Sequence, residues 1–336
     1  MRATPSSNIT VLIVTHNRRE YVSAAIESAL NQTPKHEIIV WDNASTDDTT
    51  DHIKKHYPSV TLHESSDNIS VLTARNRLVE MSTTPYVYFL DDDAYFDDPD
   101  TLQNTLAYFA HPRIGIVGLP MIEHNQFIQG SDELMATSKL ESLRFRNFCL
   151  ESACLARRDI WLYLGGYRES LGFYTEASDL SIRMIQLGFV IAFAAVTPLI
   201  HNPPPKPKTG FASHATRAHT HTANNILFTY RYVPLLRIPI VYLGQLKVIF
   251  RRYAEFNRRR LLPVGLFNGM VNIFKHLNSR NSLPTPIYVQ WCCMDQPGIT
   301  FEHLDQILPP LPSVPDSPAQ SQHDSPSEPQ TAEFQR

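Results

Sequence analysis

The first half of the chain alternates short apolar runs with longer segments of helical periodicity. Runs of strand length occur in ITVLIVTHN, EIIVWDN, the weaker VTLHE, YVYFL and RIGIVGLP. Between them, REYVSAAIESALNQ, STDDTTDHIKKHY, VLTARNRLVEMS and DPDTLQNTLAYFA have the spacing or the capping residues of helices. Strands separated by helices predict right-handed crossovers and an α/β fold whose mostly parallel sheet is flanked by helices.

Polar residues follow several of these strands at the point where each strand ends. In chain order they are Thr15, His16, Asn17 and Arg18, then Asp42 and Asn43, then Asp91, Asp92 and Asp93. In open α/β sheets, ligands bind beyond the carboxyl ends of the strands. We therefore expect all three groups on one rim of the sheet, where a ligand needs them.

The three consecutive aspartates predict a cation. Side chains alternate along an extended segment, so Asp91 and Asp93 point one way and Asp92 the other. Two hard oxygen donors on one side suit Mg²⁺ or Mn²⁺, which are commonly held by one or two carboxylates together with substrate phosphates. The alternative is a solvated acidic loop in which Asp92 or Asp93 caps a turn.

Composition narrows the classes of function. The 336 residues are 43% hydrophobic and 19% charged, which is typical of a globular protein, and the net charge of −3 gives no indication of nucleic-acid binding. Neither GxGxxG nor GxxxxGK[ST] occurs, so dinucleotide-binding and P-loop proteins lose their usual support. The four cysteines lack paired metal-site spacing, and with no secretory signal at the N-terminus we expect reduced thiols in a cytoplasmic protein.

Four segments together resemble the family 2 glycosyltransferases. They are VTHNRREYVSAAIESALNQ, EIIVWDNASTDDT, NISVLTARNRLVEMS and YVYFLDDDA, in the order and spacing of that family, and the resemblance covers roughly residues 8 to 202. It implies the GT-A fold. It also implies that Asp42 contacts the nucleobase or ribose of a nucleotide-sugar donor, that Arg75 lies near the donor phosphates, and that Asp91 and Asp93 form a DxD pair.

In that family the DxD pair holds the ribose and a divalent metal that bridges the diphosphate. With the other polar residues of the rim, the predicted donor-binding residues are Thr15, His16, Asn17, Arg18, Asp42, Asn43, Arg75, Asp91 and Asp92. The implied metal ligands are Asp91, Asp93 and His201, because His201 ends the strand pattern of VIAFAAVTPLIHNPPP where the family often has a histidine. The alternatives are that Asp42 caps the following turn, that Arg75 pairs with Glu80 or another acid of its helix, and that His16, Arg18 and His201 are ordinary loop residues.

The block GGYRESLGFYTEASDLSIRMIQLGF resembles the family's acceptor-side segment, with one departure. It predicts a helix from Glu176 to Leu187, capped by Thr175. An inverting transfer needs a carboxylate that takes the proton of the attacking hydroxyl. The family usually places that base second in an adjacent acidic pair, whereas this chain reads Glu176-Ala177. We place Glu176 first as the base and Asp179 second, with pairing of Asp179 to Arg183 as the structural alternative. A third outcome is that no base works.

The segment that follows is basic and apolar. Residues 225–280 contain ten Lys or Arg against one acid, Glu255. The best apolar stretch, 233–250, contains Arg237, Lys247 and two prolines, and each central charge costs roughly 2.5 kcal/mol or more in a spanning helix. Basic amphipathic helices on an anionic membrane surface fit better, with helices packed on the catalytic domain as the alternative. Just before it, His214, His219 and His221 are expected in an acceptor-site loop rather than a metal cluster.

These features divide the chain into four predicted parts. Residues 1–120 are the nucleotide-sugar-binding half of the GT-A domain, 121–224 the acceptor-binding half, 225–295 the basic helical region, and 296–336 a Pro/Ser-rich disordered tail. The predicted function is a Mn²⁺- or Mg²⁺-dependent inverting transfer from a UDP- or dTDP-sugar to a glycan or lipid-linked glycan in cell-surface polysaccharide synthesis. The predicted location is the inner face of the cell membrane.

Two other functions remain open. The first is a non-catalytic donor-binding or scaffold protein, because Ala177 replaces the family acid. The second is a nucleotidyltransferase, although VTHNRREY lacks the glycines of a triphosphate loop. No nucleic-acid partner is expected, because the basic residues occur with long aliphatic runs and without a nucleic-acid-binding motif.

Overall fold

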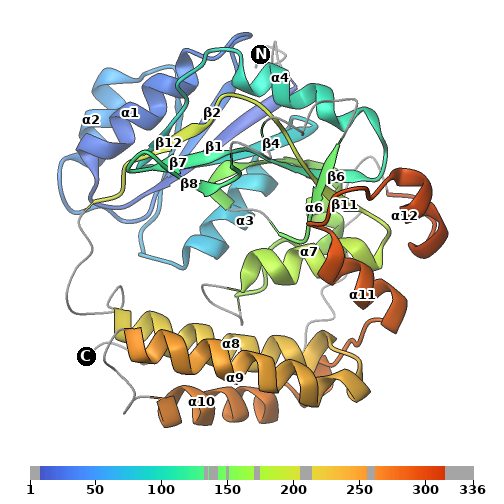
Figure 1. Cartoon of the computed structure of the whole chain (residues 1–336). Coiled ribbons are helices and arrows are strands. Elements are labelled where there is room, and N and C mark those ends of the chain that lie inside the picture. Colours follow the sequence, from blue (N-terminus) through green and yellow to red (C-terminus); the bar gives the residue numbers. More distant parts are fainter. Residues whose placement is uncertain are drawn as a thin grey trace.

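The computed structural model describes residues 8–131, 135, 143–148, 151–169, 175–204, 214–255 and 262–314, and its centre is an eight-stranded sheet. The strands of this sheet are β1 (Ile9–Thr15), β2 (Glu37–Asp42), β3 (Thr61–Glu64), β4 (Tyr86–Asp91), β6 (Ile114–Gly118), β9 (Arg144–Arg146), β10 (Cys154–Arg157) and β11 (Val190–Phe193). Their spatial order is β3-β2-β1-β4-β10-β6-β11-β9; Figure 1 labels β1, β2, β4, β6 and β11 of this sheet. The first four strands are parallel, as the sequence predicts, whereas β10 runs antiparallel between β4 and β6 and makes the sheet mixed.

The register of the parallel strands aligns the predicted rim. Thr15 at the end of β1 lies opposite Asp42 at the end of β2, and Val14 lies opposite Asp91 at the end of β4. The three polar segments therefore begin at the same edge of the sheet. The expectation of a common rim is confirmed.

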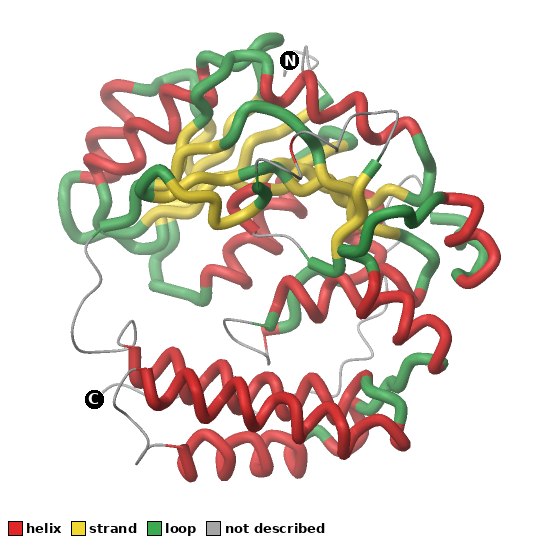
Figure 2. The backbone as a smooth tube through the Cα atoms, viewed as in Figure 1, coloured by secondary structure: helices red, strands yellow, loops and turns green. Residues whose placement is uncertain are grey.

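Helices cover both faces of the sheet (Figure 2). The helices of this domain are α1 (Arg19–Leu30), α2 (Thr49–His56), α3 (Val71–Met81), α4 (Thr101–Leu106), α6 (Arg158–Leu164) and α7 (Glu176–Gln186), with short 3₁₀ turns η1 (Ala107–Ala110) and η3 (Glu151–Ala153). Alternate residues of β1 belong to different cores: Val11 and Ile13 pack with α1, and Leu12 packs with α3. Because successive apolar side chains of β1 point to opposite faces of the sheet, helices can cover the strand on both sides.

A second, four-stranded sheet brings distant segments to the aspartates. Its strands are β5 (Ala94–Tyr95), β7 (Met121–Glu123), β8 (Gln126–Gln129) and β12 (Leu199–His201), in the order β5-β12-β7-β8. In this sheet His201 lies opposite Ala94 on one side and opposite Glu123 on the other. Because Ala94 directly follows Asp93, the pairing carries His201 to the aspartates.

Three long helices form a layer on one side of the sheet domain (Figure 1). They are α8 (His214–Tyr232), α9 (Ile238–Glu255) and α10 (Leu262–Lys275), with the 3₁₀ turns η5 (Leu235–Arg237) and η7 (Leu277–Ser279) at its ends. The predicted loop around His214, His219 and His221 is wrong, since these residues lie in α8, which is held by buried apolar residues further along it. The expected boundary between residues 224 and 225 falls inside that helix.

The last described helices pack against the sheet domain. They are α11 (Thr285–Cys293) and α12 (Phe301–Ile307). Leu304 is fully buried, Leu308 is nearly so, and Arg113 pairs with Asp305 at 2.5 Å. The tail predicted to start at residue 296 therefore starts too early, and residues 315–336 lie outside the described residues. Within the described parts of the chain, none of the helices has both the length and the apolar character needed to cross a bilayer.

Candidate donor and metal site

The loops after β1 and β2 are joined by the side chain of Asn17. Asn17 has a positive φ of 52°, a conformation that asparagine tolerates better than most residues. Its Oδ1 accepts hydrogen bonds from the backbone N–H groups of Thr46 (2.7 Å) and Asp47 (3.2 Å). His16 lies beside it, with Nε2 3.2 Å from Nδ2 of Asn68. These contacts give two of the predicted donor residues a role in shaping the rim.

Asp42 and Asn43 also organise the rim. Asp42 accepts hydrogen bonds from the N–H and hydroxyl of Ser45 and from Oγ1 of Thr50 (3.0 Å), so the capping role left open by the sequence is present. Asn43 donates to the carbonyl of Ile69 (2.8 Å) and accepts from its N–H (3.1 Å). Contact of either residue with a donor stays a prediction.

The middle aspartate of the triplet points inward. Asp92 is buried and accepts hydrogen bonds from Oγ1 of Thr15 (2.8 Å) and Nη1 of Arg18 (2.8 Å). Burial raises the pKa of Asp92 to about 7, although the charge of Arg18 opposes that shift. Arg18 also donates to Asp93 (3.0 Å), so one guanidinium joins the last two aspartates. Thr15, Arg18 and Asp92 therefore hold the end of β4 against the end of β1.

The outer two aspartates meet His201. Asp91, Asp93 and His201 each bring one possible ligand atom to a place where all three atoms lie within 4.8 Å of one another. Two carboxylates and an imidazole are a donor set that fits Mn²⁺ well and Mg²⁺ through its oxygens. The predicted association of Asp91 with Asp93 agrees with this cluster, but Asp92 and Asp93 lie in a turn rather than in extended chain, and Arg18 contacts both of them.

Arg75 joins the same cluster from α3. Its Nη2 donates to Oδ1 of Asp91 at 2.6 Å, and Arg75 is buried. The acid that the structure places against Arg75 is therefore Asp91, on a different element, rather than Glu80 of its own helix. The guanidinium of Arg75 thus lies beside the carboxylate of Asp91, the residue that would face the donor phosphates.

Glu123 is a residue of the cluster that the sequence analysis missed. Its Oε2 lies 2.8 Å from Nδ1 of His201, while Nε2 of His201 lies 3.4 Å from Oδ1 of Asp93. Burial lowers the pKa of His201, but the hydrogen bonds with Asp93 and Glu123 and the charges of Asp93 and Asp91 outweigh it, so the pKa lies above its ordinary value. For Asp93 the signs are reversed: burial raises its pKa, but the contacts with His201 and Arg18 outweigh burial, so the pKa lies below its ordinary value. No local pattern marks Glu123, because the pairing of β7 with β12 brings it there.

The two candidate bases lie in different surroundings on α7. Glu176 is the first residue of the helix and is buried. Asp179 is fully buried, and its carboxylate meets Nε of Arg183 (2.8 Å), Nη1 of Arg168 (3.5 Å) and the hydroxyl of Tyr232. The pairing of Asp179 with Arg183 is confirmed. With its oxygens engaged by two cations and a hydroxyl, Asp179 has the contacts of a structural residue.

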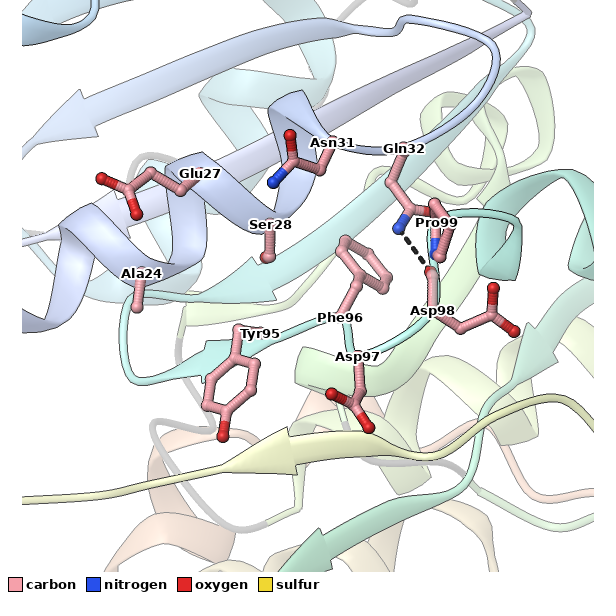
Figure 3. A pocket seen from close by; sticks show the side chains of 10 residues that line it. All are labelled: Ala24, Glu27, Ser28, Asn31, Gln32, Tyr95, Phe96, Asp97, Asp98 and Pro99. Atoms are coloured by element: carbon pink, nitrogen blue, oxygen red, sulfur yellow. Dashed lines mark hydrogen bonds between the residues drawn. The ribbon is translucent and has the colours of Figure 1, made fainter.

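A separate cavity of about 450 Å³ lies between α1 and the segment after β5 (Figure 3). It is lined by Ala24, Glu27, Ser28, Asn31, Gln32, Tyr95, Phe96, Asp97, Asp98 and Pro99. None of the predicted donor or metal residues lines it. Gln32 closes one end by donating to the carbonyl of Asp98 at 2.7 Å.

Comparison with known proteins relates the N-terminal part of the chain to one family. The model of glycosyl transferase family 2 matches residues 10–148. The O-antigen chain rhamnosyltransferase WbaN of Salmonella anatum is 23% identical over 212 residues, which are 60% of this chain and 66% of that protein. The UDP-Glc:alpha-D-GlcNAc-diphosphoundecaprenol beta-1,3-glucosyltransferase WfaP of Escherichia coli is 36% identical over 90 residues, 26% of this chain and 36% of that protein. The matches thus span about one third to two thirds of these relatives.

Solved structures show the same fold. S. aureus TarS in complex with UDP-GlcNAc has a TM-score of 0.56 at 13% identity, covering 90% of this chain and 89% of that one. The mannosyltransferase PcManGT from Pyrobaculum calidifontis, in complex with GDP-Man and Mn²⁺, has a TM-score of 0.52 at 19% identity, covering 87% and 79%. The predicted GT-A fold is confirmed by this likeness.

Proposed function

We propose that this chain, whose residues 10–148 match the model of glycosyl transferase family 2, is a metal-dependent inverting glycosyltransferase. Its donor would be a UDP- or dTDP-sugar and its acceptor a glycan in polysaccharide synthesis. The observation that carries the proposal is the convergence of Asp91, Asp93 and His201 at the rim where β1, β2 and β4 end. Such a place, beyond the carboxyl ends of parallel strands, is where α/β sheets bind their ligands.

The side chains of the rim would divide the work of holding the donor. Asp91, Asp93 and His201 would hold Mn²⁺ or Mg²⁺, which as a Lewis acid stabilises charge on a departing diphosphate. Arg75, 2.6 Å from Asp91, would add a fixed positive charge on the phosphate side. Asp42 lies at the end of the neighbouring strand, where it would accept from the nucleoside.

Glu176 is the proposed base. An acceptor hydroxyl becomes a better nucleophile as a carboxylate takes its proton, and Glu176 is the buried first residue of α7, where the resembled family has its acidic pair. The network around Asp179 would instead fix α7 so that its first residue keeps one position. Replacement of Asp179 is therefore expected to act through protein stability as well as rate.

The acceptor is proposed to be lipid-linked and the site of action to be the inner face of the cell membrane. The relative WfaP bears a name that states a UDP-glucose donor and a diphosphoundecaprenol-linked acceptor. This relative supports both the donor class and the acceptor class. The basic, apolar character of residues 225–280 supports the location.

The proposal is tested by thermal unfolding of the purified chain with UDP, dTDP, GDP or CDP, each with and without Mn²⁺. A ligand at about 100 times its Kd adds roughly 2.7 kcal/mol of stability. We expect UDP or dTDP to stabilise the protein only with metal, and Asp93→Ala to abolish that gain. Asp97→Ala, which removes an exposed acid four residues away, is the matched control and should keep it. Equal metal-dependent stabilisation of the Asp93→Ala variant would show that the site is assigned wrongly.

A second candidate function rests on Ala177. The chain has alanine where the family usually has its catalytic acid, so it could bind a donor without turning it over. The two functions are distinguished by measuring release of the nucleoside diphosphate from UDP- or dTDP-sugars. Turnover by the native chain that Glu176→Gln abolishes supports the enzyme. Turnover that occurs only after Ala177→Asp supports the binding protein.

A further inference from the structure

The helical layer exposes most of the large apolar side chains found on the surface of the described residues. Of sixteen such side chains, eleven lie between residues 235 and 277. They are Leu235, Leu236, Ile240, Leu243, Val248, Phe250, Val264, Phe267, Met270, Phe274 and Leu277. Leu236 is 94% exposed and Phe274 is 73% exposed, so they are almost fully accessible. A cluster of this kind marks an interaction surface rather than chance exposure.

The exposed residues are outward stripes of well-packed helices. On α9, Ile240, Leu243 and Phe250 recur at helical spacing, whereas Ile249 of the same helix is buried against Leu262 of α10. On α10, Val264, Phe267 and Phe274 are exposed. The inward side of α10 is close-packed, because an added Cβ at Gly269 would lie 2.6 Å from Ile226 of α8. The exposed apolar side chains therefore belong to the outer face of a well-packed helical layer.

Exposed cations accompany the apolar stripes. Arg237, Lys247, Arg251 and Lys275 are exposed on the same elements, and Lys247 falls within the stripe of α9. The only acid between residues 225 and 280 is Glu255. A second copy of this surface would bring like charges together, whereas an anionic lipid surface would meet both the charge and the apolar groups. The chemistry favours lipid over self-association.

We propose that the outer face of α9 and α10, with η5 and η7, lies on an anionic membrane surface. The exposed Leu, Ile and Phe side chains enter the boundary between headgroups and acyl chains, and the four cations contact lipid headgroups. The layer also contacts α7, the helix that begins with the proposed base, because the hydroxyl of Tyr232 on α8 donates to Asp179. Docking would thus hold the helix that starts at Glu176 beside the membrane that carries a lipid-linked acceptor. This last point rests on the proposed function.

The test is flotation of the full chain with vesicles of phosphatidylcholine, with or without phosphatidylglycerol. We expect binding to the anionic vesicles that weakens as salt is raised. The double variant Phe267→Ser/Phe274→Ser should bind about tenfold or more weakly. The variant Lys247→Glu/Arg251→Glu should lose a similar factor on anionic vesicles only. The control is Ile128→Ser/Tyr163→Ser, which removes two exposed apolar side chains outside the layer and should bind as the native chain does.

Three results would overturn the docking face. The first is no binding to either vesicle, the second is unchanged binding by the Phe267→Ser/Phe274→Ser variant, and the third is a dimer of the native chain that this variant dissociates. Thermal unfolding of each variant shows whether it is folded. The metal-dependent stabilisation by nucleotide is measured on the same samples, so loss of vesicle binding with an intact donor response concerns the membrane face alone.

Discussion

Tyr232 offers a sharp test of how the helical layer is joined to the candidate active site. Its side chain is fully buried, its hydroxyl donates to Asp179, and Nη1 of Arg168 donates to that hydroxyl at 2.7 Å. Burial, reinforced by the charge of Asp179, raises the pKa of Tyr232, so the hydroxyl stays a donor at any ordinary pH. The substitution Tyr232→Phe removes one oxygen and keeps the ring, so no cavity the size of a side chain is left.

The expected loss follows from the partners of that oxygen. A hydrogen bond to a charged group contributes roughly 1.5–3 kcal/mol, and a buried carboxylate that loses a donor cannot turn to water. Arg168 is about one third exposed, so solvent can replace its part of the interaction. Asp179 keeps its bond from Arg183. We therefore expect a loss of about 2 kcal/mol, which at an m-value of about 3 kcal/mol/M lowers the urea midpoint by ~0.7 M.

The assay is urea unfolding followed by tryptophan fluorescence, with Tyr230→Phe as the control. Tyr230 lies on the same helix, and its hydroxyl donates to a neutral carbonyl, that of Leu277, at 2.7 Å near the surface. Its loss should cost less than about 1 kcal/mol. The reasoning is refuted if Tyr232→Phe changes the free energy of unfolding by no more than Tyr230→Phe does. A second readout is kcat, which should fall for Tyr232→Phe alone if α7 positions the base.

Three further predictions concern packing and the metal cluster. In urea unfolding, Gly269→Ala should destabilise the protein by about 1–3 kcal/mol, because the added methyl group would collide with an isoleucine of α8. Gly244→Ala on α9 adds a methyl group in open space, so it should stabilise the protein by up to ~1 kcal/mol. Equal effects would argue against the close contact of α8 with α10. Glu123→Ala should weaken Mn²⁺ binding by about 10- to 100-fold in calorimetry, because His201 loses the carboxylate that orients its ring. An unchanged affinity would show that Glu123 does not support the metal site. Leu304→Ala should cost about 2–5 kcal/mol in urea unfolding, and a loss under ~1 kcal/mol would show that α12 is not part of the core.

Local pattern predicted the strands and helices that carry the rim. The apolar run of β1 and the spacing of α1 are set by neighbours a few residues apart, so the sequence shows them directly. The rule that strands of a parallel sheet end at one edge then placed Thr15, Asp42 and Asp91 together, as the register confirms. This part of the site needed no knowledge of long-range contacts.

Long-range pairing produced what the sequence did not show. Residues 154–157 insert antiparallel between β4 and β6, and no local feature of four residues specifies that place. Glu123 reaches His201 only because two short strands pair across 78 positions of the chain. The helix from His214 was expected as a loop because its first half is polar, and its burial comes from other helices. The short helix α12 is a similar case, because Leu304 is its one buried residue and Phe301 packs on His111 and Phe145.

The contacts of Asn17 and Arg18 affect the entropy that would be lost when a ligand binds. Asn17 fastens the loop after β1 to the loop after β2, and Arg18 fastens it to Asp92 and Asp93. The conformational entropy of these loops is therefore lost when the chain folds, not when a ligand binds. A nucleotide would meet a preorganised rim, so its affinity would be reduced little by ordering these segments. The free-energy cost falls instead on the stability of the folded protein, which holds Asn17 in the left-handed region and buries the carboxyl group of Asp92.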